Sequence, residues 1–384
     1  MELVSGYKVM VSSGCVRQKA STTPKFPDYA SLSGVRAPEP YHGFDIKTAK
    51  ARPYRPLRWK WHQTMALSRL EPDWWVELES SYEERIKQRI ELVQQHGSDV
   101  LAMQPGSEPA CRELMELVLQ FLCCRYPHYF SLEDEDTLFV NRILNMSTNL
   151  SSTSPLDVML QHVPEDFALM IREPTTGYYH LRAGIICSSV GWNLGTKIGL
   201  RLEDIHKPVP DYKEKMAFSM DRYFSKLPTD SPIQRGSWSF ELDQPLYLAP
   251  TEPHPSIDEL SMEEARSRIH FRVDWQTLRR MPVSGAIAFN FKGLFTPLEQ
   301  FRLEPYVPAL ALKILKEGKD DLLVYKGVRR IEKVVVPVLE EFAREQVEKG
   351  IVPANWEVQT LNESPFYPGW KEMWLQDPLD AEPS

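Results

Sequence analysis

The stretch RSRIHFRVDWQTLRRMPVSGAIAFNF, residues 266–291, decides the fold of this 384-residue chain. From Ile269 onward, apolar and polar residues alternate. Ile269, Phe271 and Val273 fall on one face, and His270, Arg272 and Asp274 fall on the other. Alternation with a period of two predicts a β-strand. The apolar residues that crowd the following part, residues 278–291, predict that the strand lies deep in the protein.

By the same period, Arg272, Asp274 and Gln276 share one face of the strand. Such a polar face is ordinarily solvated, and that interpretation stays open. If the face is buried, its polar groups must be paired with one another or bind a ligand. The strand is therefore both the predicted centre of the sheet and a candidate binding site.

Four more runs read as strands because they are short, rich in β-branched or aromatic residues and bounded by Pro, Gly or Asp. They are residues 166–173, 178–189, 237–243 and 285–295. The turn REPTTGYY, residues 172–179, predicts a hairpin between the first two. Helical spacing predicts helices over residues 72–97 and 108–126, and again over 307–318 and 332–350. The class is α+β: an antiparallel sheet between N-terminal and C-terminal helices.

The domain boundaries follow from composition. Residues 16–58 hold many prolines and basic residues and no apolar period, so residues 1–58 are predicted to form an extended or disordered arm. Residues 59–350 are predicted to form one domain, and residues 351–384 a tail. Residues 1–36 resemble a mitochondrial transit peptide weakly and a disordered leader more closely. We expect a cytoplasmic protein, with a mitochondrial location as the alternative.

Charge and motifs exclude several classes. The net charge of −8 argues against a nucleic-acid partner. The sequence contains no run of 18 apolar residues, so we expect no membrane span. Five scattered cysteines without a C-x-x-C pair argue against a zinc or iron–sulfur site. The sequence contains no G-x-G-x-x-G after a strand, no P-loop, no H-E-x-x-H and no G-x-S-x-G. Nucleotide binding and familiar hydrolase chemistry therefore have no support.

The segment DIHKPVPDY, residues 204–212, holds a histidine in a stiff place. The two prolines push the residues before them toward extended backbone, so a helix must end near His206. His206 is either a positioned metal ligand or acid–base group, or a histidine that closes a helix end. It shares the long segment between the second and third strands with Trp192 and Lys197, and Arg235 begins the third strand. A metal held mainly by a macrocycle needs only one or two protein ligands, so a single histidine suffices.

Three phrases resemble the haem-dependent oxidative N-demethylase alpha-subunit-like family, particularly its fungal members. They are KIGLRLEDIHKPVPDY (197–212), PIQRGSW (232–238) and RVDWQTLRRMPVSGAIAFNFKGLFTPL (272–298). Residues 62–86 and 178–199 fit the same pattern, so the resemblance covers roughly residues 61–327. The resemblance implies a PAS-like antiparallel sheet wrapped by helices that binds haem b. It also implies oxygen-dependent removal of a methyl group from a small amine such as dimethylamine, with release of formaldehyde. Electrons then come from NADPH through a separate reductase with flavin and iron–sulfur modules.

On this resemblance, His206 becomes the expected axial ligand of the haem iron. Arg235 and Arg272 are expected to pair with the propionates, with Trp192 and Lys197 also at the cofactor. Asp274, with Gln276, is expected to hold the amine substrate. Bacterial members have Arg-x-Glu-Arg-Gln where this chain has residues 272–276 as Arg-Val-Asp-Trp-Gln, which leaves the identity of the amine open. The alternative is a PAS-like haem or small-ligand sensor without turnover.

Overall fold

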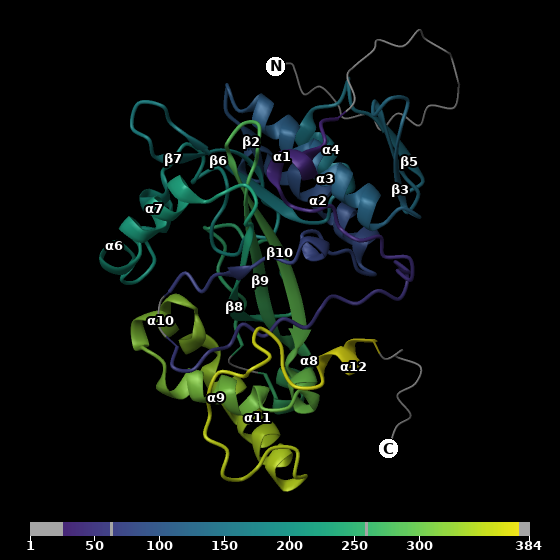
Figure 1. Cartoon of the computed structure of the whole chain (residues 1–384). Helices are drawn as coiled ribbons and strands as arrows, with labels where there is room; N and C mark the ends of the chain where they lie inside the picture. The colour runs from purple at the N-terminus through teal and green to yellow at the C-terminus, as the bar shows by residue number, and fades with distance from the viewer. Residues whose placement is uncertain (1–25, 62–63, 258–259, 376–384) are drawn as a thin grey trace, which may run out of the picture.

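The computed structural model describes residues 26–61, 64–257 and 260–375 (Figure 1). The outer parts of the predicted arm and tail, residues 1–25 and 376–384, lie outside the described residues. The described chain combines helices with antiparallel sheet, which confirms the α+β class. Among its described helices, none combines the length and the hydrophobicity that a membrane span requires.

The centre is a seven-stranded sheet in the spatial order β1-β8-β9-β10-β6-β7-β2, with every neighbouring pair antiparallel. Its strands are β1 (Ser68–Arg69), β2 (Leu101–Met103), β6 (Asp166–Arg172), β7 (Tyr179–Ile185), β8 (Ile233–Leu242), β9 (Ile269–Arg280) and β10 (Ile287–Pro297). The five predicted strands are β6 to β10, and β6 and β7 form the predicted hairpin. The edge strands β1 and β2 were not predicted because they are too short to show a period.

Strand β9 has the predicted alternation. Phe271 and Val273 are buried on one face, called the helix face, against α9 (Val307–Glu317) and α11 (Val328–Glu348). Arg272, Asp274 and Gln276 lie on the opposite face, called the cavity face. The sequence also predicted both C-terminal helices, although α11 begins four residues before the predicted start.

The N-terminal helices pack on the same helix face, at the other end of the sheet. α2 (Tyr82–His96), α3 (Glu108–Arg125) and α4 (Pro155–His162) share one apolar core with β6 and β7. In Figure 1 these helices cluster at the top right, α9 to α11 lie at the bottom, and β8 to β10 run between them. The prediction that the first helix begins at Pro72 was wrong. Residues 72–74 form a single 3-10 turn, and the buried residues 75–78 are not helical, so α2 begins ten residues later.

The remaining elements are short. A second sheet contains β3 (Phe130–Glu133), β4 (Leu138–Asn141) and β5 (Met146–Asn149), which the sequence did not reveal because each strand is only four residues long. The segment between β7 and β8 holds α5 (Leu202–His206), α6 (Tyr212–Lys215) and α7 (Ala217–Lys226). The other helices are α1 (Tyr29–Ser33), α8 (Met262–Arg268), α10 (Asp320–Tyr325) and α12 (Trp370–Leu375). The predicted end of a helix at His206 is confirmed.

Residues 50–59 cross the helix face at β9. The Tyr54 ring stacks on Trp275 with centroids 3.8 Å apart, and Arg55 forms a buried ion pair with Glu304. A Cβ at Gly236 would come within 2.6 Å of Pro56, so this position on β8 must be glycine for the crossing segment to approach. Residues 360–374 lie over the same segment: the Trp59 backbone N–H donates to Thr360 at 3.0 Å, and Trp374 Nε1 donates to the Lys50 carbonyl at 2.9 Å.

His162 joins the small sheet to α4 and gives the fold a testable response to acid. Asn141 Nδ2 lies 3.1 Å from His162 Nδ1 and can only donate, so Nε2 carries the hydrogen and donates to Thr148 Oγ1 at 2.8 Å. Burial lowers the pKa of His162 from 6.5 to about 3. Between these two values the unfolded chain binds a proton that the folded chain does not.

We therefore expect the free energy of unfolding to fall as the pH drops from about 6.5 to about 3, with a His162 contribution on the order of 5 kcal/mol. Urea unfolding across this range measures it, with His162→Gln as the comparison. The variant should be less stable at neutral pH and should show a shallower dependence on pH. Parallel pH curves for the two proteins would show that His162 is not responsible.

Candidate functional site

A large cavity lies between the cavity face of the sheet and the segment that holds α5 to α7. Its volume is about 950 Å³, near the upper end of the usual range of about 300–1,000 Å³ for ligand pockets. Strands β6 to β10 supply one wall, and α10 closes the lower side. Every candidate residue named from the sequence lines it: Trp192, Lys197, His206, Arg235, Arg272, Asp274 and Gln276.

The register of β8 and β9 sets the polar wall. Arg235 lies opposite Gln276, Ser237 opposite Asp274, and Ser239 opposite Arg272. Directly opposed residues of an antiparallel pair point to the same face, so these six side chains project together into the cavity. On β10, Phe291 lies opposite Gln276 and continues this wall as an apolar surface.

Arg272 is held by the protein itself. Its Nε and Nη2 donate to Asp274 Oδ1 at 3.1 and 2.9 Å, and Nη1 donates to the Pro245 carbonyl at 3.1 Å. Nη2 also donates to the Ser188 carbonyl. Arg272 is 2 % exposed, so its charge is balanced inside the protein by Asp274. The second oxygen of Asp274 accepts no hydrogen bond from the described residues and remains available at the cavity.

His206 ends α5 with its ring fixed in one orientation. Its Nδ1 lies 2.8 Å from the Leu202 carbonyl, and its ring stacks on Tyr212 with centroids 5.0 Å apart. A carbonyl can only accept, so Nδ1 carries the hydrogen and Nε2 keeps its lone pair. Burial, followed by the nearby charges of Arg235 and Lys197, lowers the pKa of His206 and favours the neutral ring. His206 can therefore close the helix through Nδ1 and still keep Nε2 available for another bond.

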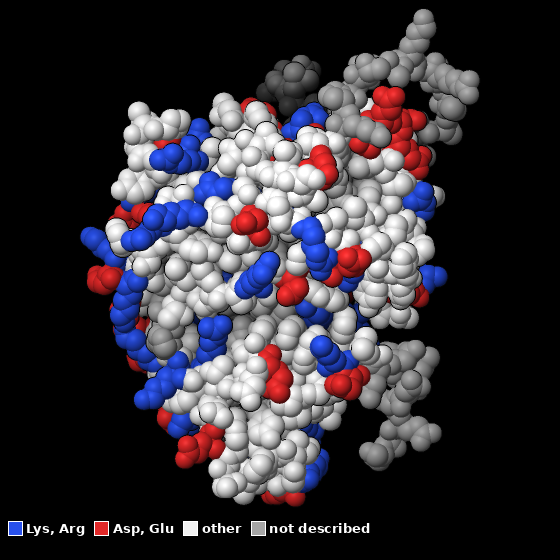
Figure 2. All heavy atoms as spheres, viewed as in Figure 1, with Lys and Arg blue, Asp and Glu red and all other residues white. Residues whose placement is uncertain are grey.

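The cavity is rich in positive charge. Among the described residues, its lining includes seven Lys or Arg (Arg58, Lys60, Lys197, Arg235, Arg272, Lys326, Arg330) and two acids, Glu241 and Asp274, although the whole chain is acidic. Figure 2 shows basic side chains gathered along the left of this face, between the positions of α6 and α7 above and α10 below. An anionic or partly anionic ligand would complement this lining.

Arg235 is a cavity cation whose hydrogen bonds within the protein are incomplete. Its Nε is buried without a hydrogen-bond partner among the described residues, and desolvation lowers its pKa. A buried, unpaired guanidinium is costly unless a ligand completes its bonds. Lys197 Nζ, by comparison, reaches the Ile205 carbonyl at 3.4 Å.

Trp192 lines the cavity, whereas His180 does not. His180, on β7, does not line the cavity: its Nδ1 lies 3.0 Å from the Gly199 carbonyl and its Nε2 3.7 Å from Glu173. Trp192 does line the cavity and packs against Phe291 with ring centroids 6.4 Å apart. Within the described ranges, no group of three or more His, Cys, Asp or Glu side chains is arranged to hold a metal ion.

Sequence reasoning missed Lys326, which follows α10. Its Nζ donates to Ser237 Oγ, and desolvation lowers its pKa to about 8, partly opposed by the charge of Asp274. Lys326 is distant in sequence from the other cavity residues and has no motif around it. Only the packing of α10 beneath β8 brings it to the site.

A comparison with protein families identifies the chain. Residues 66–336 match the family model described as haem-dependent oxidative N-demethylase, alpha subunit-like. The match includes β6 to β10, the segment with α5 to α7, and all seven candidate residues. The chain therefore belongs to the haem-dependent oxidative N-demethylase alpha-subunit-like family.

Proposed function

We propose that this chain binds haem b in the cavity of about 950 Å³ and removes a methyl group from a small alkylamine, using O₂ and electrons from a separate reductase. The observation that supports the proposal most is that a neutral histidine, an unpaired buried arginine and a half-exposed carboxylate line one cavity in a member of this family. The β6–β10 sheet, covered by the segment between its second and third strands, is consistent with the proposed PAS-like fold.

The residues present fit haem on physical grounds. Haem has a broad apolar ring, two propionates and an iron that accepts an axial imidazole. The cavity offers apolar side chains from the core cluster of β6, β7 and α5 to α7, with Trp192 beside them. His206 Nε2 is the proposed iron ligand, and its Nδ1–H bond to Leu202 is the outer contact that orients such ligands.

Arg235 is the preferred partner for a propionate, supported by Lys197. Its guanidinium has unused donors, and a carboxylate would satisfy them with charge-assisted hydrogen bonds. Arg272 was an equal candidate from the sequence, but its donors are directed to Asp274, Ser188 and Pro245. We propose that Arg272 instead positions Asp274.

Asp274 is proposed to bind the amine. Arg272 occupies one carboxylate oxygen, and the other can accept an N–H from a protonated alkylamine, with Gln276 beside it on the same strand. A single short acid would hold one small ammonium group in one orientation, which is what positioning of a methyl group requires. Bound haem supplies the oxygen activation and the one-electron chemistry.

The overall reaction balances as amine, O₂, two electrons and two protons giving the demethylated amine, formaldehyde and water. The matching family is described as an alpha subunit, and the electrons are therefore proposed to come from another protein. A cytoplasmic location, where reduced nicotinamide is available, suits this requirement.

Replacing His206 tests the proposed ligand. Apoprotein mixed with hemin should give a Soret band, and His206→Ala should weaken hemin binding by more than about 100-fold because the axial bond is lost. His42→Ala and His96→Ala are controls, since neither histidine lines the cavity. An unchanged Soret band in His206→Ala would place the iron ligand elsewhere, with Lys197 as the next choice.

Replacing Arg235 should move stability and binding in opposite directions. Arg235→Met removes a buried unpaired charge, so the apoprotein should gain about 1 kcal/mol of unfolding free energy. The same change removes the propionate partner and should weaken hemin binding roughly 10-fold to 100-fold. Arg69→Met, at an exposed position on β1 away from the cavity, should change neither quantity. Unaltered hemin affinity in Arg235→Met would contradict the assignment.

Replacing Asp274 separates binding from turnover. Hemin-loaded, reduced wild type given O₂ and dimethylamine should release formaldehyde, and the amine should shift the haem spectrum. Asp274→Asn should keep its Soret band but lose both responses, because the amide cannot balance an ammonium charge. Asp243→Asn, a surface acid paired with Arg268, is the matched control. Hemin binding by wild type without formaldehyde would favour the sensor alternative.

A further inference from the structure

A second, much smaller chamber lies at the edge of the central sheet. The pairing of β10 with β6 ends at Phe291 and Asp166, so Lys292 and Gly293 have no neighbouring strand on that side. Here the helix face and the cavity face of the sheet meet around a space of about 20 Å³. Apolar residues such as Leu246 and Phe291 line part of it, and the polar and charged lining residues are Glu77, Glu79, Arg85, Arg89, Glu165, Asp166, Ser188 and Lys292.

The chamber shares wall residues with the large cavity, and other parts of its wall are partly exposed. Ser188 and Phe291 line the chamber and the cavity alike. At the opposite side, the chamber is lined by Glu79 and Arg85, which are partly exposed. A Cβ at Gly293 would lie 3.6 Å from Ser188 and 3.9 Å from Arg272, so the absence of a side chain leaves space beside the Ser188 wall that the chamber and the cavity share.

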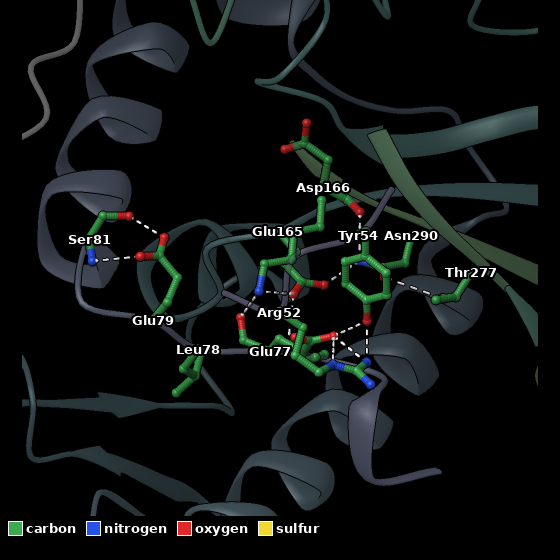
Figure 3. Close-up of polar contacts among 12 residues, drawn as sticks. Arg52, Tyr54, Glu77, Leu78, Glu79, Ser81, Glu165, Asp166, Thr277 and Asn290 are labelled. Atoms are coloured by element: carbon green, nitrogen blue, oxygen red, sulfur yellow. Dashed lines mark hydrogen bonds and ion pairs between the residues drawn. The ribbon is translucent and has the colours of Figure 1, made fainter. Parts of the chain in front are cut away.

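Glu165 is the titratable group at the centre of this arrangement. Its Oε1 accepts from the Glu77 backbone N–H at 2.9 Å, and its Oε2 accepts from Asn290 Nδ2 at 2.8 Å (Figure 3). Lys292 Nζ lies 3.8 Å away but donates to the Glu77 carbonyl at 2.5 Å. Burial raises the pKa of Glu165 to about 7, and Lys292 opposes the rise.

Other charged groups around Glu165 have fixed partners. Glu77 is paired with Arg52 and bonded to Tyr54, as Figure 3 shows. Asp166 accepts from Arg89 and from the backbone and hydroxyl of Ser188. The charge of Arg52 helps to hold the pKa of Glu77 below its usual value, whereas burial raises that of Glu165.

Arg89 supplies a place for water. It is 1 % exposed, and its Nε and Nη2 have no hydrogen-bond partner among the described residues. A chamber of about 20 Å³ exceeds the roughly 10–15 Å³ that one water molecule needs, and the polar lining offers the two to four partners that a buried water uses. One water there would donate to carboxylates and accept from Arg89.

We propose that Glu165 is a proton-relay residue that supplies the Asp274 end of the cavity through a water molecule in this chamber. A proton from solvent passes by way of Glu79 to the Glu165 carboxylate. The Glu165 carboxyl then gives its proton to the chamber water, which releases one toward Ser188 and the cavity. No electron moves, and the carboxylate is restored for the next proton. The inference rests on the proposed function, whose reaction consumes two protons.

The first test needs no cofactor. Infrared spectra of the apoprotein, taken between about pH 5 and about pH 9, should contain a protonated-carboxyl band that disappears with a midpoint near 7. Glu165→Gln, which keeps the size and an acceptor oxygen, should remove this band. Glu116→Gln, at a partly buried acid bonded to Tyr29 on α3, should leave it in place. Persistence of the band in Glu165→Gln, or its absence from wild type, would overturn the proposal.

The second test follows turnover in the hemin-loaded protein. Wild type should release less formaldehyde per electron consumed as the pH rises through about 7, because protonated Glu165 becomes scarce. Glu165→Gln should lower this yield roughly tenfold, release hydrogen peroxide instead and lose the pH dependence. Gly293→Ala should lower the yield with the infrared band unchanged, since the new methyl group closes the passage at ordinary contact distances.

The outcomes distinguish this inference from the proposed function. If wild type and Glu165→Gln release formaldehyde with the same yield and the same pH dependence, the relay is wrong and the demethylase activity stands. If loaded wild type releases none at any pH, the proposed function fails and the relay fails with it. Hemin affinity and thermal stability measured for each variant show whether a lost yield has a structural cause.

Discussion

Strand β9 is covered on both faces, and the rest of the structure depends on how its polar face is satisfied. Phe271 and Val273 anchor the C-terminal helices, so the strand cannot turn its other side to bulk water. A buried charge on that side must find its partner within the protein. Arg272 does so by bonding Asp274, Ser188 and Pro245, and this fixes the loop after β7 against the strand. The same bonds leave one oxygen of Asp274 facing the cavity, so the contact that stabilises the sheet also creates a directed binding group.

The helix face also contains buried polar residues, and their hydrogen bonds are formed in a different way. Its two apolar cores, one around α3 and one around α11, are separated on the sheet by Thr277, Asn290 and Lys292. Thr277 donates to Asn290, Asn290 donates to Glu165, and Lys292 donates to the Glu77 carbonyl. The Glu77 carboxylate in turn accepts from Arg52 and Tyr54 (Figure 3). Each added bond restricts its neighbours, so the network specifies one register between the halves. It also contains the carboxyl of Glu165, whose pKa burial raises to about 7.

The sequence predicted the central features because they are local. Period two along residues 269–278 predicted β9 and its two faces, and the diproline context predicted that a helix ends at His206. The long segment between β7 and β8 was predicted to hold candidate site residues, and the structure brings Trp192, Lys197 and His206 to the same space as Arg235 and Asp274. Their chemical roles stay predictions. Features that depend on distant contacts were missed: Lys326 reaches the cavity through helix packing, and the Glu165–Lys292 pair joins residues 127 positions apart. The start of α2 was misplaced because Trp75, Val76 and Leu78 are buried in a non-helical segment, although their composition also suits a helix.

The crossing of residues 50–59 by residues 360–374 has a consequence for the order of synthesis. The Trp59–Thr360 contact joins positions 301 residues apart. Residues 50–59, called the strap, therefore leave the ribosome long before residues 360–374, which hold them in place. Closing such a long loop has an entropic cost, and contacts of this range form late. Until then, the contacts of Tyr54 with Trp275 and of Pro56 with Gly236 are not covered by residues 360–374. The strap is therefore fixed in place only after residues 360–374 have been synthesised and packed, and the sheet that carries the cavity gains its full rigidity late in folding.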